Sequence, residues 1–170
     1  WARYYNLKYG LDVRCLRYPG LISYQSLPGG GTTDYAVDIF HKAINGQDFE
    51  SYLKEDTQLP MLYMDDAIEA TLQLMEAPKE AIKTVGYNIQ GISFSPVELL
   101  TAIQKYIPDF TATYKPDHRQ AIAESWPISL DDKPAREEWG WKPKFDLDKM
   151  TQEMLKQLEL KKNNSQKLHA

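Results

Sequence analysis

Short apolar runs alternate along this chain with segments of helical periodicity, and this alternation constrains the fold more than any other feature. The strand-like runs cover residues 11–18, 59–64, 85–89 and 110–114. The segments with apolar residues at helical spacing cover 34–44, 66–77, 96–107 and 147–161. Strands that alternate with helices predict an α/β fold with parallel strands rather than an all-α bundle.

Local signals set several helix ends. Residues 95–98, Ser-Pro-Val-Glu, form a capping box with proline at the first helical position, which predicts that a helix begins there. Thr33 or Asp34 can cap the helix at 34–44, and Asp65–Asp66 can cap the one that follows. We expect the last helix to give way to a flexible polar tail at 162–170.

Residues 1–10 carry aromatic side chains at i and i+4 and stop at Gly10, as the end of a helix does. The chain is therefore expected to begin inside a helix, followed by a strand at 11–18 that Pro19 and Gly20 end. This order is typical of the second half of a βαβ unit. Cys15, alone in the apolar strand, is expected to be a buried, inert thiol.

Composition narrows the function classes. Hydrophobic residues make up 42% and charged residues 26% of the chain, which suits a globular protein with one modest core. A formal net charge of −4 gives no basic surface, which argues against nucleic acid and anionic membranes as partners. Because no apolar run approaches the roughly 18 residues that a membrane-spanning helix needs, we expect a soluble protein.

Motifs that carry chemistry are sparse. His41, His118 and His169 lie far apart without a paired cysteine, which does not support a metal site, and the GxSxG of many hydrolases is absent. Residues 28–34, Pro-Gly-Gly-Gly-Thr-Thr-Asp, lead into a helix N-terminus, where free amides favour an anion, but they lack the lysine of a P-loop. The run fits either a ligand-binding loop or a mobile loop with an ordinary helix cap.

Tyr4 and Lys8 have the i, i+4 spacing by which some oxidoreductases activate a catalytic tyrosine. The chain contains 11 tyrosines, so a chance match is expected, and Gly10 ends the helix almost at once. We therefore place Tyr4 and Lys8 at the surface or at an interface.

Several segments resemble a known family. In order, they are 16–20 (LRYPG), 62–67 (LYMDDA), 87–89 (YNI) and 139–143 (WGWKP), and together they resemble the C-terminal half of the extended short-chain dehydrogenases. Segments 28–36 and 125–136 resemble the NAD-dependent L-threonine 3-dehydrogenases of that class. The resemblance runs from Trp1 to about Leu160. It implies the last parallel strands of an NAD(P)-binding Rossmann fold joined to a small α/β substrate-binding subdomain.

The resemblance also implies roles for particular residues. The strand end beside the nicotinamide of NAD corresponds to Tyr18, Pro19, Gly20 and Leu21. The substrate side corresponds to Thr32, Thr33, Asp34 and Trp126. Hydroxyls or helix-end amides suit the carboxylate of an amino acid, and an aspartate suits its ammonium group. Trp126 would either form a pocket wall or pack as a core aromatic. The family's catalytic Tyr–Lys pair would lie upstream of Trp1, so no residue here is assigned as catalytic, and none as a metal ligand.

The expected organisation follows the family. The parts are 1–27 (end of the Rossmann portion), 28–84 (substrate-side loop, helices and strand), 85–108 (return strand and helix of the Rossmann portion), 109–161 (substrate-binding subdomain and C-terminal helix) and 162–170 (flexible tail). With a missing N-terminal half, the enzyme would oxidise the 3-hydroxyl of L-threonine to 2-amino-3-oxobutanoate, with hydride transfer to NAD. This part alone would be inactive.

The resemblance further implies a homodimer when full length and a mitochondrial location in a eukaryote, otherwise a cytoplasmic one. Two alternatives stay open. The first is a nucleotide-sugar epimerase or dehydratase, whose diphosphate would need basic residues such as Lys115 and Arg119. The second is an inactive remnant that serves only as a binding module.

Overall fold

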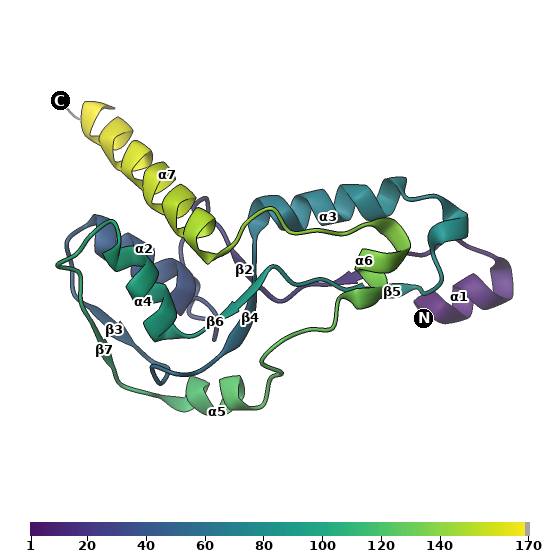
Figure 1. The fold of residues 1–170 in the computed structure, drawn as a ribbon, viewed down its shortest axis with the longest axis horizontal. Coiled ribbons are helices and arrows are strands. Elements are labelled where there is room, and N and C mark those ends of the chain that lie inside the picture. Colours follow the sequence, from purple (N-terminus) through teal and green to yellow (C-terminus); the bar gives the residue numbers. More distant parts are fainter. Residues whose placement is uncertain (169–170) are drawn as a thin grey trace.

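The computed structural model describes residues 1–168 and has the α/β fold expected from the sequence, with parallel strands and helices packed against them (Figure 1). The elements in chain order are α1 (Ala2–Tyr9), β1 (Cys15–Arg17), β2 (Gly20–Ile22), α2 (Tyr35–Ile44), β3 (Phe49–Ser51), β4 (Leu59–Tyr63), α3 (Met64–Glu76), the 3₁₀ helix η1 (Lys79–Ala81), β5 (Gly86–Asn88), β6 (Ile92–Phe94), α4 (Pro96–Gln104), β7 (Ala112–Tyr114), α5 (His118–Glu124), α6 (Lys133–Trp139) and α7 (Leu147–Leu168).

The strands form three small groups that join distant parts of the sequence. β1 pairs with β5, β2 with β4 and β3 with β7, all in parallel, and β6 pairs antiparallel to β4. In the registers, Cys15 lies opposite Gly86 and Gly20 opposite Met61. Parallel partners cannot be joined by a tight turn, so crossover connections with helices lie between them.

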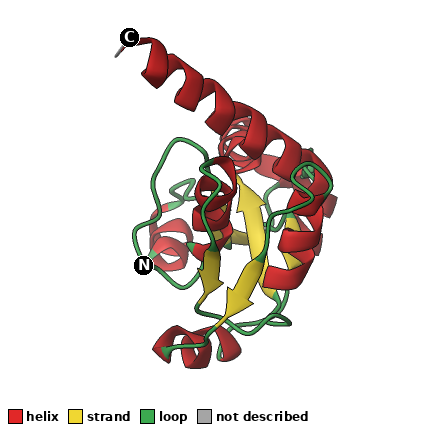
Figure 2. Ribbon diagram, turned by 90° about the vertical axis from the view of Figure 1, so that its left-hand side faces the viewer, coloured by secondary structure: helices red, strands yellow, loops and turns green. Residues whose placement is uncertain are grey.

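Two hydrophobic clusters stabilise the molecule. In Figure 1 the elements around the first form a lobe and those around the second form an arm. The lobe gathers α2, α4 and α7 around β2, β4 and β6, and its core includes Phe40, Leu99 and Met154. The arm gathers α3, α6 and β5 around Tyr87 and Trp141. Figure 2 shows α7 projecting beyond the lobe toward the C-terminus. The two clusters do not coincide with the organisation that we expected. Within the expected range 85–108, β5 belongs to the arm whereas α4 belongs to the lobe.

Three strands were not expected, and each has only three residues. We expected Pro19 and Gly20 to end the first strand, but the chain continues as β2 from Gly20. Proline has no N–H to donate to a strand ladder, and at this point pairing changes from β5 to β4. β3 and β6 are too short for an alternation of apolar and polar residues to be visible in the sequence.

The capping box at the start of α4 is confirmed. The N–H of Ser95 donates to Oε2 of Glu98 at 2.8 Å, and the N–H of Glu98 donates to Oγ of Ser95 at 3.4 Å. The end of α1 is also as expected, since Gly10 adopts a left-handed conformation with φ of 65°. Local signals of this kind act over three or four residues and can therefore be read from the sequence alone.

The cap that we expected at the start of α3 was wrong. The helix begins at Met64, and the buried carboxylate of Asp66 accepts hydrogen bonds from the N–H groups of Lys144 (3.0 Å) and Phe145 (3.0 Å). Burial raises the pKa of Asp66, and these hydrogen bonds oppose that rise. Asp66 therefore fastens a distant segment to α3 instead of capping it.

Two further expectations need correction. Cys15 is exposed rather than buried, because β1 pairs with a single strand in a two-stranded sheet. The last helix does not end near Lys161 but continues to Leu168. Two lysines of α7 bind the helix to the lobe. Nζ of Lys161 donates to the carbonyl of Tyr24 at 3.0 Å, and Nζ of Lys162 donates to the carbonyl of Ile44 at 2.8 Å. His169 and the rest of the expected tail lie outside the described residues.

Within residues 1–168, none of the helices combines the length and the apolar character needed to cross a membrane.

Candidate functional site

A pocket of about 460 Å³ opens where the chain passes from β1 to β2, and we call it the strand-switch pocket. Four segments that are distant in the sequence line it: first Arg17, Tyr18, Pro19, Gly20 and Leu21, second Thr33, third Pro60, and fourth Trp126, Pro127 and Leu130. All four residues expected at the cofactor are in this lining, as are Thr33 and Trp126 from the substrate side. Thr32 and Asp34 are the neighbours of Thr33 in the chain, but they do not line the pocket.

Gly20 sets how closely Thr33 and its loop approach β2. A methyl group on Gly20 would lie 2.5 Å from Sδ of Met61 and 2.7 Å from Cγ2 of Thr33, both inside normal contact distance. Gly20 does not have a positive φ, so space rather than backbone conformation requires glycine here. The absent side chain lets Thr33 reach the wall of the pocket.

Polar side chains at the edge of the pocket have partners. The Tyr18 hydroxyl forms a hydrogen bond of 2.5 Å with Oγ1 of Thr71 on α3, and Nη1 of Arg17 donates to Oδ1 of Asn88 at 2.7 Å. The Tyr18 hydroxyl is therefore directed to α3, and a ligand in the pocket would meet the ring or the backbone of this residue.

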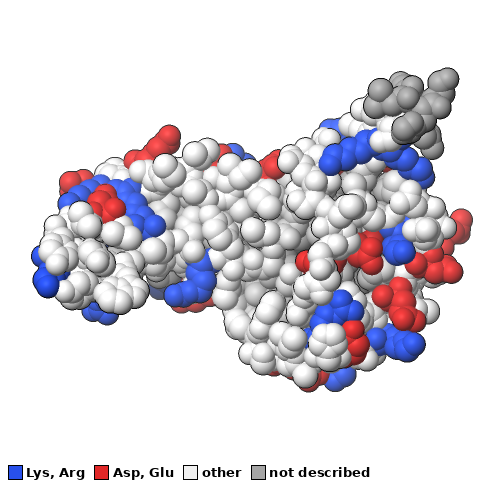
Figure 3. All heavy atoms as spheres, turned by 180° about the vertical axis from the view of Figure 1, so that it is seen from behind, with Lys and Arg blue, Asp and Glu red and all other residues white. Residues whose placement is uncertain are grey.

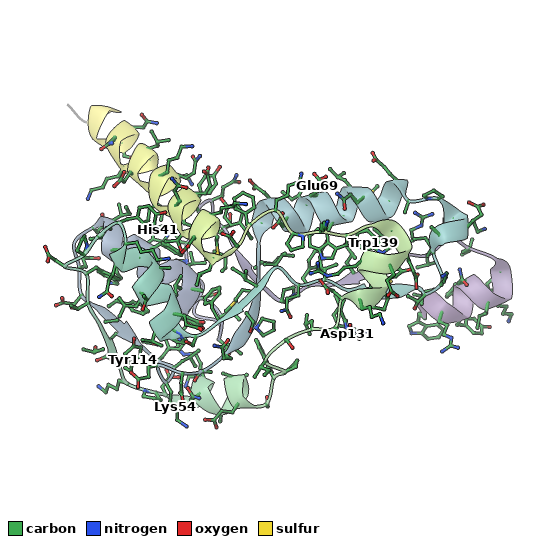
Figure 4. The ribbon with its side chains drawn as sticks, viewed as in Figure 1. His41, Lys54, Glu69, Tyr114, Asp131 and Trp139 are labelled. Carbon is green, nitrogen blue, oxygen red and sulfur yellow. The ribbon has the colours of Figure 1, made fainter. Side chains whose placement is uncertain are left out.

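Trp126 begins a segment that polar residues of β5, of β6 and of the connection between these strands hold in place. The amide of Asn88 donates to the carbonyl of Asp131 at 3.1 Å, the side chain of Gln90 accepts from the N–H of Leu130, and Ser93 donates to the carbonyl of Ile128. Figure 4 shows Asp131 on the connection between α5 and α6. Sequence reasoning missed these holding residues, although Asn88 lies in one of the family-like segments.

The side chain of Trp126 is 42% exposed and lines the strand-switch pocket, so it is not packed in either hydrophobic cluster. Of the two roles considered for it, the geometry therefore favours a pocket wall. Contact with a substrate stays a prediction.

The glycine loop, residues 29–34, is closed by its own aspartate. The carboxylate of Asp34 accepts hydrogen bonds from the N–H groups of Gly29 (2.7 Å) and Gly31 (2.9 Å), and Asp34 is the N-cap residue of α2 without a side-chain bond to that helix. Gly30 has φ of 94°, a conformation that favours glycine. Asp34 thus organises the loop, and its predicted contact with a substrate ammonium group would add to that role.

Two side chains from elsewhere also hold the glycine loop. The Tyr52 hydroxyl donates to the carbonyl of Gly31 at 2.8 Å, and Nη1 of Arg119 donates to the carbonyl of Gly30 at 3.3 Å. Burial raises the pKa of Tyr52 to about 12, so its hydroxyl keeps the donated proton at neutral pH. The hydrogen-bonded Arg119 guanidinium holds the pKa of Asp117 at about 2, which keeps this ion pair charged.

Arg119 and Lys115, the basic residues considered for a diphosphate, are not in the lining of the strand-switch pocket. Nε and Nη2 of Arg119 donate to Asp117, and Nη1 donates to the glycine loop. All three nitrogens of the guanidinium therefore already donate hydrogen bonds within the protein.

Other residues considered from the sequence lie away from the pocket. Nζ of Lys8 donates to the Tyr4 hydroxyl at 2.7 Å, but both side chains are exposed on α1, at the far end of the arm (Figure 1). Trp139 and Trp141, from the family-like segment 139–143, pack in the arm with ring centroids 6.2 Å apart (Figure 4 labels Trp139). Among residues 1–168, no three His, Cys, Asp or Glu side chains are grouped as metal ligands would be.

Comparison with known proteins gives a consistent result. The chain is 55% identical over 155 residues to the mitochondrial L-threonine 3-dehydrogenase of Bos taurus, which covers 91% of this chain and 42% of that protein. It is 48% identical over 165 residues to an uncharacterised epimerase/dehydratase of Staphylococcus haemolyticus, covering 96% of this chain and 52% of the relative. No family model matches the chain.

Solved structures agree with these relatives. The holo form of a GalE-like L-threonine dehydrogenase from Cupriavidus necator superposes with a TM-score of 0.91 at 53% identity, covering 93% of this chain and 52% of that one. The chain thus spans about half the length of the proteins that it matches. By sequence and by fold, it is similar over more than nine-tenths of its length to one half of an epimerase/dehydratase-like L-threonine 3-dehydrogenase, consistent with the C-terminal half.

Proposed function

We propose that this chain forms the substrate side of an NAD-dependent L-threonine 3-dehydrogenase and also supplies the strand end that lies against the nicotinamide. One observation carries the proposal: the strand-switch pocket unites Tyr18–Leu21, the residues assigned to the cofactor, with Thr33 and Trp126, assigned to the substrate. The relatives named as L-threonine dehydrogenases add the identity of the substrate.

The residues present fit the nicotinamide end of NAD. Pro19, Leu21 and Pro60 give the pocket an apolar wall suited to a flat ring, and Gly20 keeps the substrate-side loop close to that wall. Bound NAD would supply the hydride acceptor. The protein's part here is to hold the ring beside the substrate and to limit the access of water to it.

The substrate side suits a small hydroxy amino acid. Thr32 and Thr33, at the start of α2, would hold the carboxylate with their hydroxyls and nearby amides. Asp34 brings negative charge toward the ammonium group while it keeps the glycine loop closed. Trp126 would cover the apolar part of the substrate. The base that removes the hydroxyl proton would come from the remaining half of the enzyme.

The arm provides a surface for that remaining half. β1 has one partner strand in the described structure, and Ile68, Leu72 and Met75 of α3 are exposed. Figure 3 shows that the middle of the molecule, seen from behind, carries few charged side chains, whereas charges gather toward both ends. We infer that the rest of the sheet packs against the arm. From the resemblance to the L-threonine 3-dehydrogenases we also propose that the complete enzyme is a homodimer. The mitochondrial relative from Bos taurus supports a mitochondrial location if the organism is a eukaryote.

The test uses the complete enzyme, in which this chain is joined to its remaining half. NADH formation is followed with L-threonine. Conversion of UDP-glucose is followed separately by chromatography of the sugar nucleotides, because an epimerase or dehydratase returns the hydride to the sugar and forms no net NADH. We expect turnover with L-threonine only, and Trp126→Ala should raise the KM for L-threonine more than the KM for NAD. Absence of turnover with L-threonine would contradict the proposal.

A nucleotide-sugar reaction is the second candidate, and the relative from Staphylococcus haemolyticus favours it. The engaged guanidinium of Arg119 argues against it, because a diphosphate would need free basic groups near the pocket. Turnover with UDP-glucose would decide for this candidate. If the isolated 170-residue chain turned over L-threonine, our expectation that this part is inactive alone would be wrong.

A further inference from the structure

The geometry points to Tyr52 and Arg119 as positioning residues that hold the glycine loop against the strand-switch pocket and so set the affinity for the substrate. Neither residue lines the pocket. The inference rests on the proposed function, since it concerns the same substrate site. It assigns to two residues from different parts of the chain a joint role in substrate affinity.

The parallel pair β3–β7 brings these residues together. Glu50 lies opposite Thr113 in the register, and pairing continues beyond the strands, where the N–H of Lys115 donates to the carbonyl of Ser51 at 2.7 Å. The N–H of Asp117 then donates to the carbonyl of Tyr52 at 3.2 Å. Tyr52 and the start of α5 therefore lie side by side at the carboxyl ends of both strands, the edge at which parallel strands present functional groups.

At this edge, Arg119 makes three kinds of contact. Its guanidinium lies over the Tyr52 ring, 3.2 Å from the centroid, and it donates to both carboxylate oxygens of Asp117. The remaining nitrogen, Nη1, donates to Gly30. Asp117 and the Tyr52 ring fix the orientation of the guanidinium, and this fixes the direction in which Nη1 points.

The contacts continue to both walls of the pocket. Tyr52 and Arg119 hold the carbonyls of Gly31 and Gly30, and the same loop contains Thr33, which lines the pocket. On the other side, α5 carries Arg119 and ends just before Trp126, whose N–H donates to the carbonyl of Ala123 at 3.1 Å. One short helix thus connects the loop wall to the Trp126 wall, as Figure 1 shows for the path from β7 through α5.

The sharpest variant is Tyr52→Phe, which removes the hydroxyl bonded to Gly31 and keeps the ring that stacks on Arg119. We expect the KM for L-threonine to rise roughly three- to tenfold, as the loss of one hydrogen bond implies, while the dissociation constant of NAD changes less than about twofold. Arg119→Lys keeps the charge but loses the planar fork, so it should have the same effect. Tyr106→Phe, at an exposed tyrosine outside the pocket lining, is the matched control.

Hydrogen exchange provides a readout that does not depend on turnover. In the complete enzyme, amides of the glycine loop should exchange faster in Tyr52→Phe and Arg119→Lys than in the wild type and the control. Unchanged exchange would overturn the inference, and so would faster exchange without a change in the KM for L-threonine, because the residues would then only stabilise the loop. If the wild type does not oxidise L-threonine, the proposed function fails, while the exchange data still report on the contacts.

Discussion

Replacing Gly20 by alanine tests the packing that brings the glycine loop to the strand-switch pocket. The new methyl group would lie 2.5 Å from Sδ of Met61, 2.7 Å from Cγ2 of Thr33 and 3.0 Å from Cβ of Thr33. Carbon and sulfur atoms in contact prefer separations of roughly 3.5–4.0 Å, so the neighbours must move by about 1 Å. Met61 is fully buried in β4 and has little room to move. If Met61 does not move, Thr33 must be displaced from the pocket wall.

We expect Gly20→Ala to lower the free energy of unfolding by about 1–3 kcal/mol, the usual cost of overpacking a core, and to raise the KM for L-threonine. Urea unfolding of the complete enzyme measures the first effect and steady-state kinetics the second. Gly86→Ala is the control, because Gly86 is also a strand glycine but has no neighbouring atom within 4 Å of an added methyl group. Thr33→Ser removes the clashing Cγ2 and should recover part of the stability of Gly20→Ala. Equal stability of Gly20→Ala and Gly86→Ala would refute the reasoning.

Three further predictions concern contacts that hold the surroundings of the site. Asp66→Ala leaves the N–H groups of Lys144 and Phe145 without their acceptor, so urea unfolding should show a loss of about 2 kcal/mol, larger than that of Asp66→Asn. Ser95→Ala removes the capping box of α4 and should lower the free energy of unfolding by about 1 kcal/mol, with unchanged kinetics. The pKa of Asp117 is lowered from 3.8 to about 2, so its stabilising contribution is complete above about pH 4 and is lost as the pH falls toward 2. NMR titration of its carboxyl carbon should give this low midpoint, and a midpoint near the ordinary value would show that Arg119 does not bind it in solution.

Much of the architecture could be predicted because the signals are local. The helical period, the capping box at 95–98 and the glycine at the end of α1 act within one or two turns, and the structure has the helices that they predict. The family-like order of segments placed Tyr18–Leu21, Thr33 and Trp126 in one site, and the structure brings them to one pocket.

What could not be predicted depends on pairing between distant segments. The acceptor role of Asp66 requires the chain at Lys144 and Phe145 to cross the first turn of α3, and no nearby residue indicates this. The contact of Tyr52 with Arg119 requires the parallel pair β3–β7, whose strands are too short to show a pattern. Cys15 was expected to be buried because it lies in an apolar strand pattern, and that pattern does not show that β1 pairs with β5 alone within residues 1–168.

The central claim is that L-threonine binds at the Trp126 wall of the strand-switch pocket. Fluorotryptophan NMR of the complete enzyme tests it directly, with resonances assigned by single Trp→Phe replacements. In the presence of NAD, we predict that L-threonine shifts the Trp126 resonance and leaves that of Trp141, which is buried in the arm, unchanged. An unchanged Trp126 resonance at concentrations of L-threonine that saturate turnover would contradict the account.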